Sequence, residues 1–337
     1  MTEAEAPGKL VVCGEYAVLA DAPAIAVAVD VRARARVAAG GEGCRLEVPD
    51  EGSWAFRWDE RGLPDWEAQP EHGRGLVLGA VAVTLADAGL AVREDLSITL
   101  DSRAFHVPGG GKLGLGSSAA ITVALIAALC AEVGRPLAQH TVFELAQIAH
   151  RRLQAGSGSG IDIAAAVHGG VVGLVPGEEV AVLGWPAGLH WFAAWSGYGA
   201  ATMPLLRRFN AYRRRQARSA VGAGPLDQLC EVARAAYTAW QQADAATILR
   251  TLEIYGEALN ILDTTARIGI ATRAHRRMAT MAAELGCVYK TSGAGGGDFG
   301  LVLSDDAAVI GRAAREFAAA GIRMLEGGAD VAGLQTR

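Results

Sequence analysis

Lysine is scarce in this chain of 337 residues. Only three of its 31 basic residues are lysine (Lys9, Lys112 and Lys290), and all the others are arginine. Each of the three stands beside a glycine-rich segment. Because lysine offers a compact ammonium where arginine offers a planar fork, these positions indicate sites that need a point charge.

Cysteines, long apolar runs and excess positive charge are also lacking. The five cysteines form no CxxC pair, which favours buried thiols in a reducing compartment over a disulfide framework or a zinc site. The longest plain apolar run, 119–131, is shorter than the roughly 20 residues of a membrane-spanning helix. The acidic N-terminus lacks the basic region of a secretory signal. With a net charge of −5, we expect a cytoplasmic protein without nucleic-acid or membrane partners.

Glycine, by contrast, is abundant and gathers in a loop before an apolar helix. The run Pro108-Gly-Gly-Gly111 is followed by Lys112-Leu-Gly-Leu-Gly-Ser-Ser-Ala-Ala120 and then by the apolar segment 121–130. Glycines let a ligand approach the backbone, and the first N–H groups and the dipole of a helix favour an anion. Ser117 and Ser118 can cap the helix or bind phosphate or Mg²⁺. The segment therefore predicts a phosphate-binding loop.

The remaining pattern mixes strands and helices without strict alternation, which indicates an α+β architecture. The stretch 59–74 is expected to be a polar loop, and helices are expected to break near Gly222–Pro225 and Gly269. Expected strands are 9–14, 24–37, 44–48, 54–58, 96–100, 171–175, 179–183, 189–194, 287–290, 299–303 and 322–325. Expected helices are 75–90, 118–133, 137–153, most of 204–285, and 307–320.

Two further segments accompany the phosphate loop. The first is Ala6-Pro-Gly-Lys-Leu10 with Gly14-Glu-Tyr-Ala-Val18, and the other is Lys290-Thr-Ser-Gly-Ala-Gly-Gly-Gly297. In this order the three resemble the signature of the GHMP kinase superfamily. The resemblance implies two domains, which we expect at 1–185 (similar to ribosomal protein S5) and 186–337 (ferredoxin-like). It also implies ATP and Mg²⁺ as cofactors and a small-molecule phosphoryl acceptor in the cleft between the domains.

The resemblance assigns roles to individual residues. Asp162 matches the catalytic aspartate of mevalonate-type members, Lys9 would pair with it, and Lys112 would act beside them. The expected residues for ATP phosphates are Gly114, Leu115, Gly116, Ser117, Ser118 and Ala119, with Ser118 as a metal ligand. Those of the third motif are Ser292, Gly293, Ala294, Gly295 and Gly296. Those for the acceptor are Glu15, Tyr16, His150, Arg151, Ser159, Gly160 and Thr202.

Details of these motifs are most similar to the phosphomevalonate kinase branch, which implies transfer to the phosphate of 5-phosphomevalonate. Mevalonate kinases carry a Mg²⁺-binding Glu about eleven residues before the aspartate, where this chain has His150-Arg-Arg152. A cationic cluster there could receive a phosphorylated acceptor. One segment departs from the branch, because Ala201 and Met203 stand where it usually has Ser and Lys.

The sequence leaves several alternative functions open. The acceptor could be a hydroxyl of mevalonate, of a sugar or of another metabolite. A nucleotide-binding regulatory relative could keep the fold with little catalysis, although Lys9, Lys112, Ser118 and Asp162 together argue against it. A decarboxylase relative is disfavoured. The sequence is compatible with a homodimer but does not fix the oligomeric state.

Overall fold

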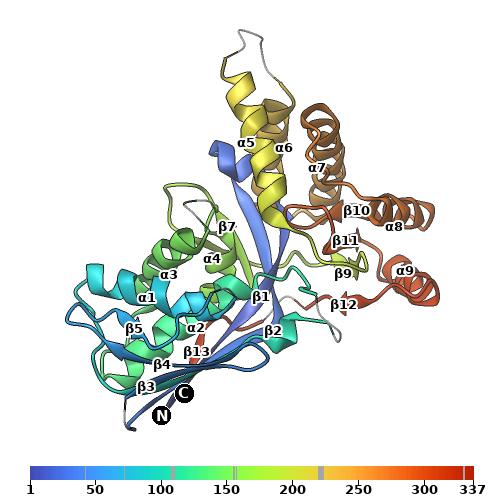
Figure 1. Ribbon diagram of the computed structural model, residues 1–337. Coiled ribbons are helices and arrows are strands. Elements are labelled where there is room, and N and C mark those ends of the chain that lie inside the picture. Colours follow the sequence, from blue (N-terminus) through green and yellow to red (C-terminus); the bar gives the residue numbers. More distant parts are fainter. Residues whose placement is uncertain are drawn as a thin grey trace.

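Two sheets and the helices packed on them make up the protein, as seen in a computed structural model (Figure 1). The structure describes residues 1–41, 43–71, 73–107, 111–154, 156, 158–218, 224–328 and 331–337. In these residues the larger sheet has nine strands and the smaller has four. The predicted mixture of helix and sheet is confirmed.

The larger sheet runs in the order β13-β1-β2-β6-β3-β4-β5, with β7 paired to β2 and β8 paired to β7. Its helices α1 to α4 contact one another, and α2 and α4 pack on β1 and β2. Its strands are β1 (Thr2–Cys13), β2 (Ala24–Ala39), β3 (Cys44–Val48), β4 (Gly52–Trp58), β5 (Pro64–Trp66), β6 (Leu96–Asp101), β7 (Val171–Leu174), β8 (Ala181–Leu183) and β13 (Gln335–Thr336). Its helices are α1 (Gly75–Asp87), α2 (Ser117–Glu132), α3 (Gln139–Leu153) and α4 (Ile161–His168).

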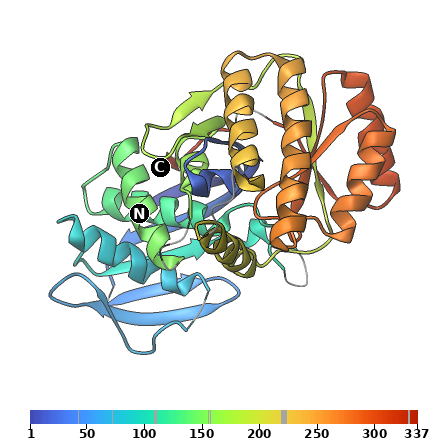
Figure 2. The same cartoon turned by 90° about the horizontal axis from the view of Figure 1, so that it is seen from above.

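The smaller sheet is antiparallel, in the order β10-β11-β9-β12. This order and the intervening helices match a ferredoxin-like unit, and Figure 2 shows its helices beside the sheet, away from β3 and β4. The strands are β9 (His190–Trp195), β10 (Val288–Thr291), β11 (Phe299–Ser304) and β12 (Met324–Glu326). The helices are α5 (Thr202–Gln216), α6 (Pro225–Gln241), α7 (Ala245–Ala266), α8 (Arg273–Glu284) and α9 (Ala307–Ala319).

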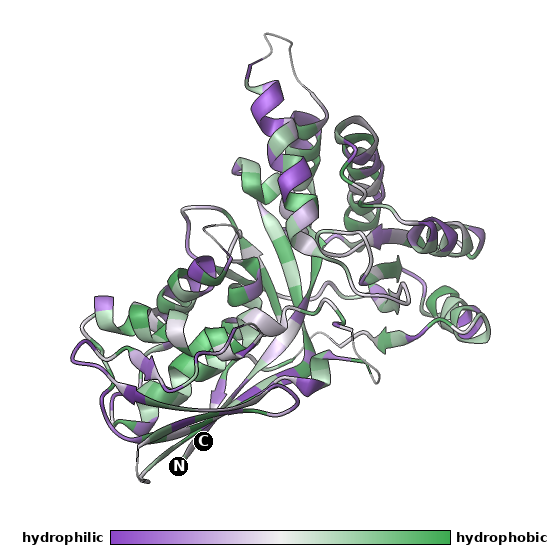
Figure 3. Ribbon diagram, in the orientation of Figure 1, coloured by the Kyte–Doolittle hydropathy of each residue, from purple (hydrophilic) through white to green (hydrophobic). Residues whose placement is uncertain are grey.

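Helix α2 forms the centre of the larger core. Every residue from Ala119 to Cys130 is buried, so this helix is apolar on all sides, as expected for a helix enclosed by other elements. Helix α8 differs, because only His275, Met278 and Ala282 are buried, and Figure 3 shows hydrophilic residues along it. No helix in the described part of the chain is long and apolar enough to cross a membrane. All five cysteines are buried and unpaired, as predicted.

Strand β1 is longer than predicted because charge pairing extends it to the N-terminus. Glu3 pairs with Arg36 and Glu5 with Arg34, and these pairs lie across β1 and β2. Opposite charges on facing strand residues stabilise such a pair of strands. The C-terminal strand β13 pairs with the other edge of β1, so the two termini lie side by side (Figure 1).

Two local predictions were wrong. The stretch expected to be a polar loop contains β5, which pairs with β4 and places Trp66 against Phe56, with ring centroids 4.9 Å apart. The long helical stretch also breaks between α6 and α7, where Ala243 has a φ of 52° and the Asp244 side chain accepts from the Thr247 N–H. No glycine or proline marks this break. The break expected near Gly222–Pro225 lies partly outside the described residues.

Candidate active site

The three glycine segments and the start of α4 meet around one cavity of about 260 Å³. Strand β1 contributes Lys9, and the third motif contributes Gly293 and Ala294. The phosphate loop contributes Gly114, Gly116, Ser117 and Ser118. Segments that are far apart in the sequence therefore form one site. The other lining residues are Val11, Gly14, Glu15, Tyr16, Val18, Leu19, Ala24, Lys112, His150, Gly158, Ser159, Gly160, Ile161, Asp162, Ala200, Thr202, Leu206 and Asp298.

The predicted phosphate loop enters α2 through Gly116, which precedes the helix with a φ of 82°. No side chain caps this helix start, so Ser117 and Ser118 are not used as caps, and both line the cavity. Leu113 and Leu115 are buried, and the Lys9 N–H donates to the Leu115 carbonyl at 2.8 Å. The loop is thus anchored to β1 while its helix N-terminus opens towards the cavity, as an anion site requires.

Two residues of the predicted ATP-binding set, Leu115 and Ala119, do not line this cavity, whereas Gly114, Gly116, Ser117 and Ser118 do. Ala119 is buried in the first turn of α2, and its N–H donates to the Gly116 carbonyl at 3.1 Å. Leu115 is likewise buried beneath the loop. These two residues hold the loop, and the glycines and serines face the cavity.

Lys9 and Asp162 form an ion pair of 3.3 Å inside the cavity. The Lys9 side chain is only 8% exposed, whereas that of Asp162 is 31% exposed. Asp162 lies in the first turn of α4, and Gly160 precedes that helix with a φ of 87°. Lys9 passes close to the phosphate loop, since a Cβ at Gly116 would lie 3.4 Å from its Cε and Cγ. A cation and a carboxylate therefore stand together at the predicted phosphate position.

Lys112 lies at the junction of this cavity with a second one of about 200 Å³. Ser117 and Ser118 line both cavities as well. An extended anion bound at the start of α2 would therefore have space on both sides of the loop. The other residues that line the second cavity are Glu51, Gly73, Arg74, Val77, Ser102, His106 and Ile121. The segment Pro108–Gly110 of the predicted glycine run lies outside the described residues.

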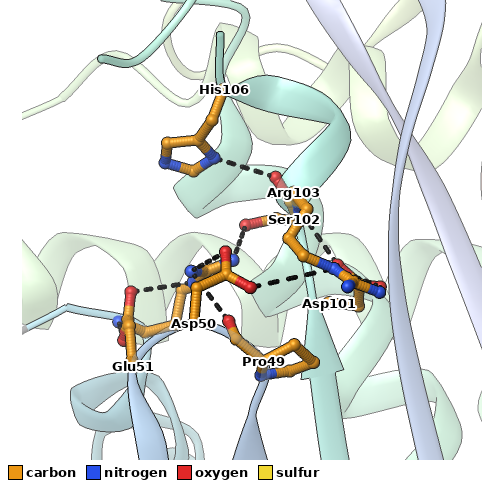
Figure 4. A network of polar contacts seen from close by, with 8 residues as sticks. Pro49, Asp50, Glu51, Asp101, Ser102, Arg103 and His106 are labelled. Atoms are coloured by element: carbon orange, nitrogen blue, oxygen red, sulfur yellow. Dashed lines mark hydrogen bonds and ion pairs between the residues drawn. The ribbon is translucent and has the colours of Figure 1, made fainter. Parts of the chain in front are cut away.

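A polar network forms one wall of the second cavity (Figure 4). The Arg74 guanidinium donates to the Glu51 carboxylate at 2.8 Å and to Ser102 Oγ at 3.3 Å. His106 Nδ1 lies 3.1 Å from the Ser102 carbonyl, and Asp101 pairs with Arg103. These contacts join the loop after β3, the start of α1 and the end of β6.

The third motif is fixed to β1 and its continuation. The Val11 N–H donates to Ser292 Oγ at 2.8 Å, and the Tyr16 hydroxyl donates to the Ala294 carbonyl at 2.6 Å. Gly295 must remain glycine because its φ is 74° and a Cβ would lie 2.4 Å from Ile270 Cγ2. At Gly296 a Cβ would lie 2.9 Å from a methyl group of Leu205. Gly293 and Ala294 thus face the cavity, and the next two glycines pack behind them.

Lys290, the third lysine, is fully buried and pairs with Glu15. Its ammonium also donates to the Thr291 carbonyl and lies 5.7 Å from the centre of the Tyr255 ring. The Gly293 N–H donates to Glu15 Oε1 at 3.2 Å, while Glu15 Oε2 is buried with no hydrogen-bond partner in the described residues. Two of the three lysines therefore stand in the cavity, and Lys290 supports its wall from beneath.

The expected cationic cluster on α3 does not converge on the cavity. Only His150 lines it, and burial lowers the pKa of its imidazole. Arg151 is exposed and donates to Gln147, and Arg152 pairs with Asp87. Consecutive residues of a helix point about 100° apart, so three in a row cannot share one face. Ser159, Gly160 and Thr202 line the cavity.

Buried histidines should make the stability of the protein depend on pH. Burial lowers the pKa values of His150 and His275, so below about pH 6.5 the unfolded chain binds more protons than the folded one. We expect the free energy of unfolding to fall as the pH drops below this value, by at most about 1.4 kcal/mol per pH unit for each histidine. Urea unfolding of the wild type, His150→Gln and His275→Gln at several pH values checks this. An unchanged slope in both variants would refute the assignment.

Asp298 is a cavity residue that was not among the predicted site residues. It ends the third motif, and its Oδ1 accepts from the Ala200 N–H at 2.8 Å. Burial raises the pKa of this carboxyl, and the Ala200 N–H and Lys9 offset the effect only in part. In the sequence, Asp298 stands out only as an acidic residue at the end of a glycine run. That position alone does not show which way its side chain points.

The chain is similar to known proteins in both sequence and fold. Residues 75–170 match the family described as GHMP kinases N terminal domain. The chain is 33% identical over 338 residues to a phosphomevalonate kinase of Streptomyces sp. (strain CL190), covering 89% of each chain. Among solved structures, a Lin0012 protein from Listeria innocua aligns with a TM-score of 0.83 at 24% identity, covering 100% of this chain and 99% of that one. Streptococcus pneumoniae phosphomevalonate kinase, in complex with phosphomevalonate and AMPPNP, aligns with a TM-score of 0.76 at 21% identity, covering 100% of both.

Proposed function

Because the chain belongs to the GHMP kinase family and is a small-molecule phosphotransferase, we propose that it transfers the terminal phosphoryl group of ATP to the phosphate of 5-phosphomevalonate. The products are 5-diphosphomevalonate and ADP. The observation that carries this proposal is the 33% identity, over 89% of the chain, to a protein named for that reaction. We further propose a division into domains at 1–185 and 186–337, supported by the change of sheet between β8 and β9.

The geometry supports a transfer that works by positioning and charge. An oxygen of the acceptor phosphate attacks the γ-phosphorus of ATP, the bond from that phosphorus to the β–γ bridging oxygen breaks, and ADP leaves. Charge spreads over the transferred oxygens in such reactions. Lys9 would neutralise part of it, Asp162 would hold Lys9 in place, and the start of α2 with Lys112 would bind the nucleotide phosphates.

The nature of the acceptor decides what Asp162 has to do. A phosphate monoester has a second pKa near 6 and is largely ionised at neutral pH, so its oxygen needs no general base. An alcohol acceptor would need a proton removed, and Asp162 would be placed to take it. With 5-phosphomevalonate, Asp162 therefore acts mainly by orienting Lys9.

The residues present fit Mg²⁺ as the metal that accompanies ATP. Hydroxyl and carboxylate oxygens are the hard ligands that Mg²⁺ prefers, and Ser118 and Asp162 supply them in the cavity. Within the described residues no three acidic, histidine or cysteine side chains gather into a metal site. Such a cation would take most of its ligands from phosphate and water, as is usual for Mg²⁺ in kinases. When bound, it offsets charge on the β- and γ-phosphate oxygens.

An acceptor panel tests the proposal. ADP release would be measured with ATP and Mg²⁺ against 5-phosphomevalonate, mevalonate, homoserine and several sugars. We expect saturable turnover with 5-phosphomevalonate alone, which would make Ala201 and Met203 tolerated differences from related kinases. Turnover on a different acceptor, or on none, would overturn the assignment. Such a result would indicate that the segment from Ala200 to Met203 has changed which acceptor the cavity binds. This segment borders the cavity through Ala200 and Thr202.

A further inference from the structure

The carboxylate of Asp298 projects from the third motif onto the phosphate loop. An added Cβ at Gly114 would lie 2.0 Å from Asp298 Cγ, so the carboxyl group occupies the space that a side chain at Gly114 would need. Its main chain is held by the loop after β9, through hydrogen bonds with Tyr198 and Ser196 of 2.9 and 2.8 Å. This acidic group is therefore fixed against the predicted phosphate loop.

The charge of Asp298 is only partly compensated. Its Oδ1 accepts from the Ala200 N–H. Among the described residues, no side-chain cation pairs with it within 4.0 Å, and no hydrogen bond reaches Oδ2. Lys9 attracts it from a longer distance but forms its ion pair with Asp162. A carboxylate in this position would repel the phosphates of a nucleotide unless a cation stood between them.

The backbone at Asp298 has a conformation that costs energy for residues other than glycine. Its φ is 60°, in the left-handed region that glycine adopts most easily. Glycine occupies the three preceding positions, Gly295 to Gly297. An aspartate here accepts backbone strain that a fourth glycine would avoid, and such strain is often retained where the side chain has a function.

A second observation concerns helix α3, which borders the cavity. In this chain the residue of α3 that reaches the cavity is His150, whose pKa burial lowers, and Glu144 is exposed on the helix. Helix α3 therefore contributes no carboxylate to the described lining of the cavity. Asp298 provides one beside Gly114 of the predicted phosphate loop.

We propose that Asp298, together with Ser118 and Asp162, receives the divalent cation carried by the nucleotide, directly or through a bound water. The inference rests on the kinase activity and not on the identity of the acceptor. Its free oxygen would face the cation, while Oδ1 keeps the Ala200 N–H. The acidic group would thus favour the metal–nucleotide complex over the bare nucleotide.

Calorimetric binding of ADP to the wild type and to Asp298→Asn, with excess Mg²⁺ and with EDTA, tests this without any turnover. Asparagine keeps an oxygen for the Ala200 N–H but loses the charge. We expect the enhancement of ADP affinity by Mg²⁺ to fall by about tenfold or more, and affinity in EDTA to stay equal or increase. Asp305→Asn is the matched control, because Asp305 is exposed beyond the far end of β11 and its loss should change neither affinity.

If Asp298 only braces the loops, Asp298→Asn will keep the Mg²⁺ enhancement within about twofold of the wild type, and the proposal fails. Asp298→Ala provides a second variant in case the asparagine variant does not fold, with the same expected loss. Since ADP alone is the probe, a wrong acceptor assignment would leave this result intact, and a failure here would not affect the acceptor assignment.

Discussion

Replacing Lys9 with methionine is expected to lower kcat by about a hundredfold to a thousandfold, with a much smaller change in the KM for ATP. Lys9 stands beside Gly116 and Asp162 at the predicted position of the transferred group. Loss of one preorganised charge at a developing anion has effects of this size. Steady-state kinetics with saturating 5-phosphomevalonate would measure it.

The variant should remain folded, since the partner that it leaves behind is 31% exposed and stays hydrated. Asp162→Asn is the natural comparison. With a phosphate acceptor it should lose less activity than Lys9→Met, because the acceptor needs no base. A near-total loss of turnover in Asp162→Asn alone would show that this carboxylate does more than orient Lys9. A Lys9→Met variant with nearly unchanged kcat would show that the charge of Lys9 does not contribute to phosphoryl transfer.

The second large effect concerns stability. Lys290→Met is expected to lower the free energy of unfolding by about 3–5 kcal/mol, because it leaves the buried Glu15 without its cation. The double variant Glu15→Gln/Lys290→Met removes both charges, and replacing a whole buried pair costs far less than breaking it. It should therefore recover most of the lost stability. Urea unfolding of both variants would measure the difference.

Arg57→Met provides a control for the loss of a positive charge at an exposed position and should change stability by less than about 0.5 kcal/mol. If the double variant is as unstable as Lys290→Met, the pair is not the source of the effect, and the packing of the lysine chain against Tyr255 would explain it. If Lys290→Met is as stable as the wild type, the buried ion pair does not contribute to the free energy of unfolding, and the prediction is wrong.

Much of the site could be predicted because its components follow local rules. A glycine loop before an apolar helix favours an anion site, and the scarcity of lysine singled out Lys9 and Lys112, which both line the cavity. The positions of most strands and helices followed from hydrophobic periodicity. These signals lie within a few residues of one another in the chain.

What could not be predicted depends on partners that are distant in the sequence. Glu15 and Lys290 are 275 positions apart, and no local pattern shows that they pair. The strand at the N-terminus needs the arginines of β2 and the C-terminal β13 to form. Asp298 is identified as a cavity residue only when its contact with Gly114 is seen. Tertiary contacts determine all three.

In the proposed reaction the acceptor atom is an oxygen of a phosphate group and not of an alcohol. Phosphorus NMR of a reaction with 5-phosphomevalonate, ATP and Mg²⁺ tests it most directly, because it identifies the bond that forms. We expect loss of the monoester signal and growth of two coupled signals from a new diphosphate, in step with ADP. A second monoester signal, with no new phosphoanhydride, would show that a hydroxyl was phosphorylated and would contradict it.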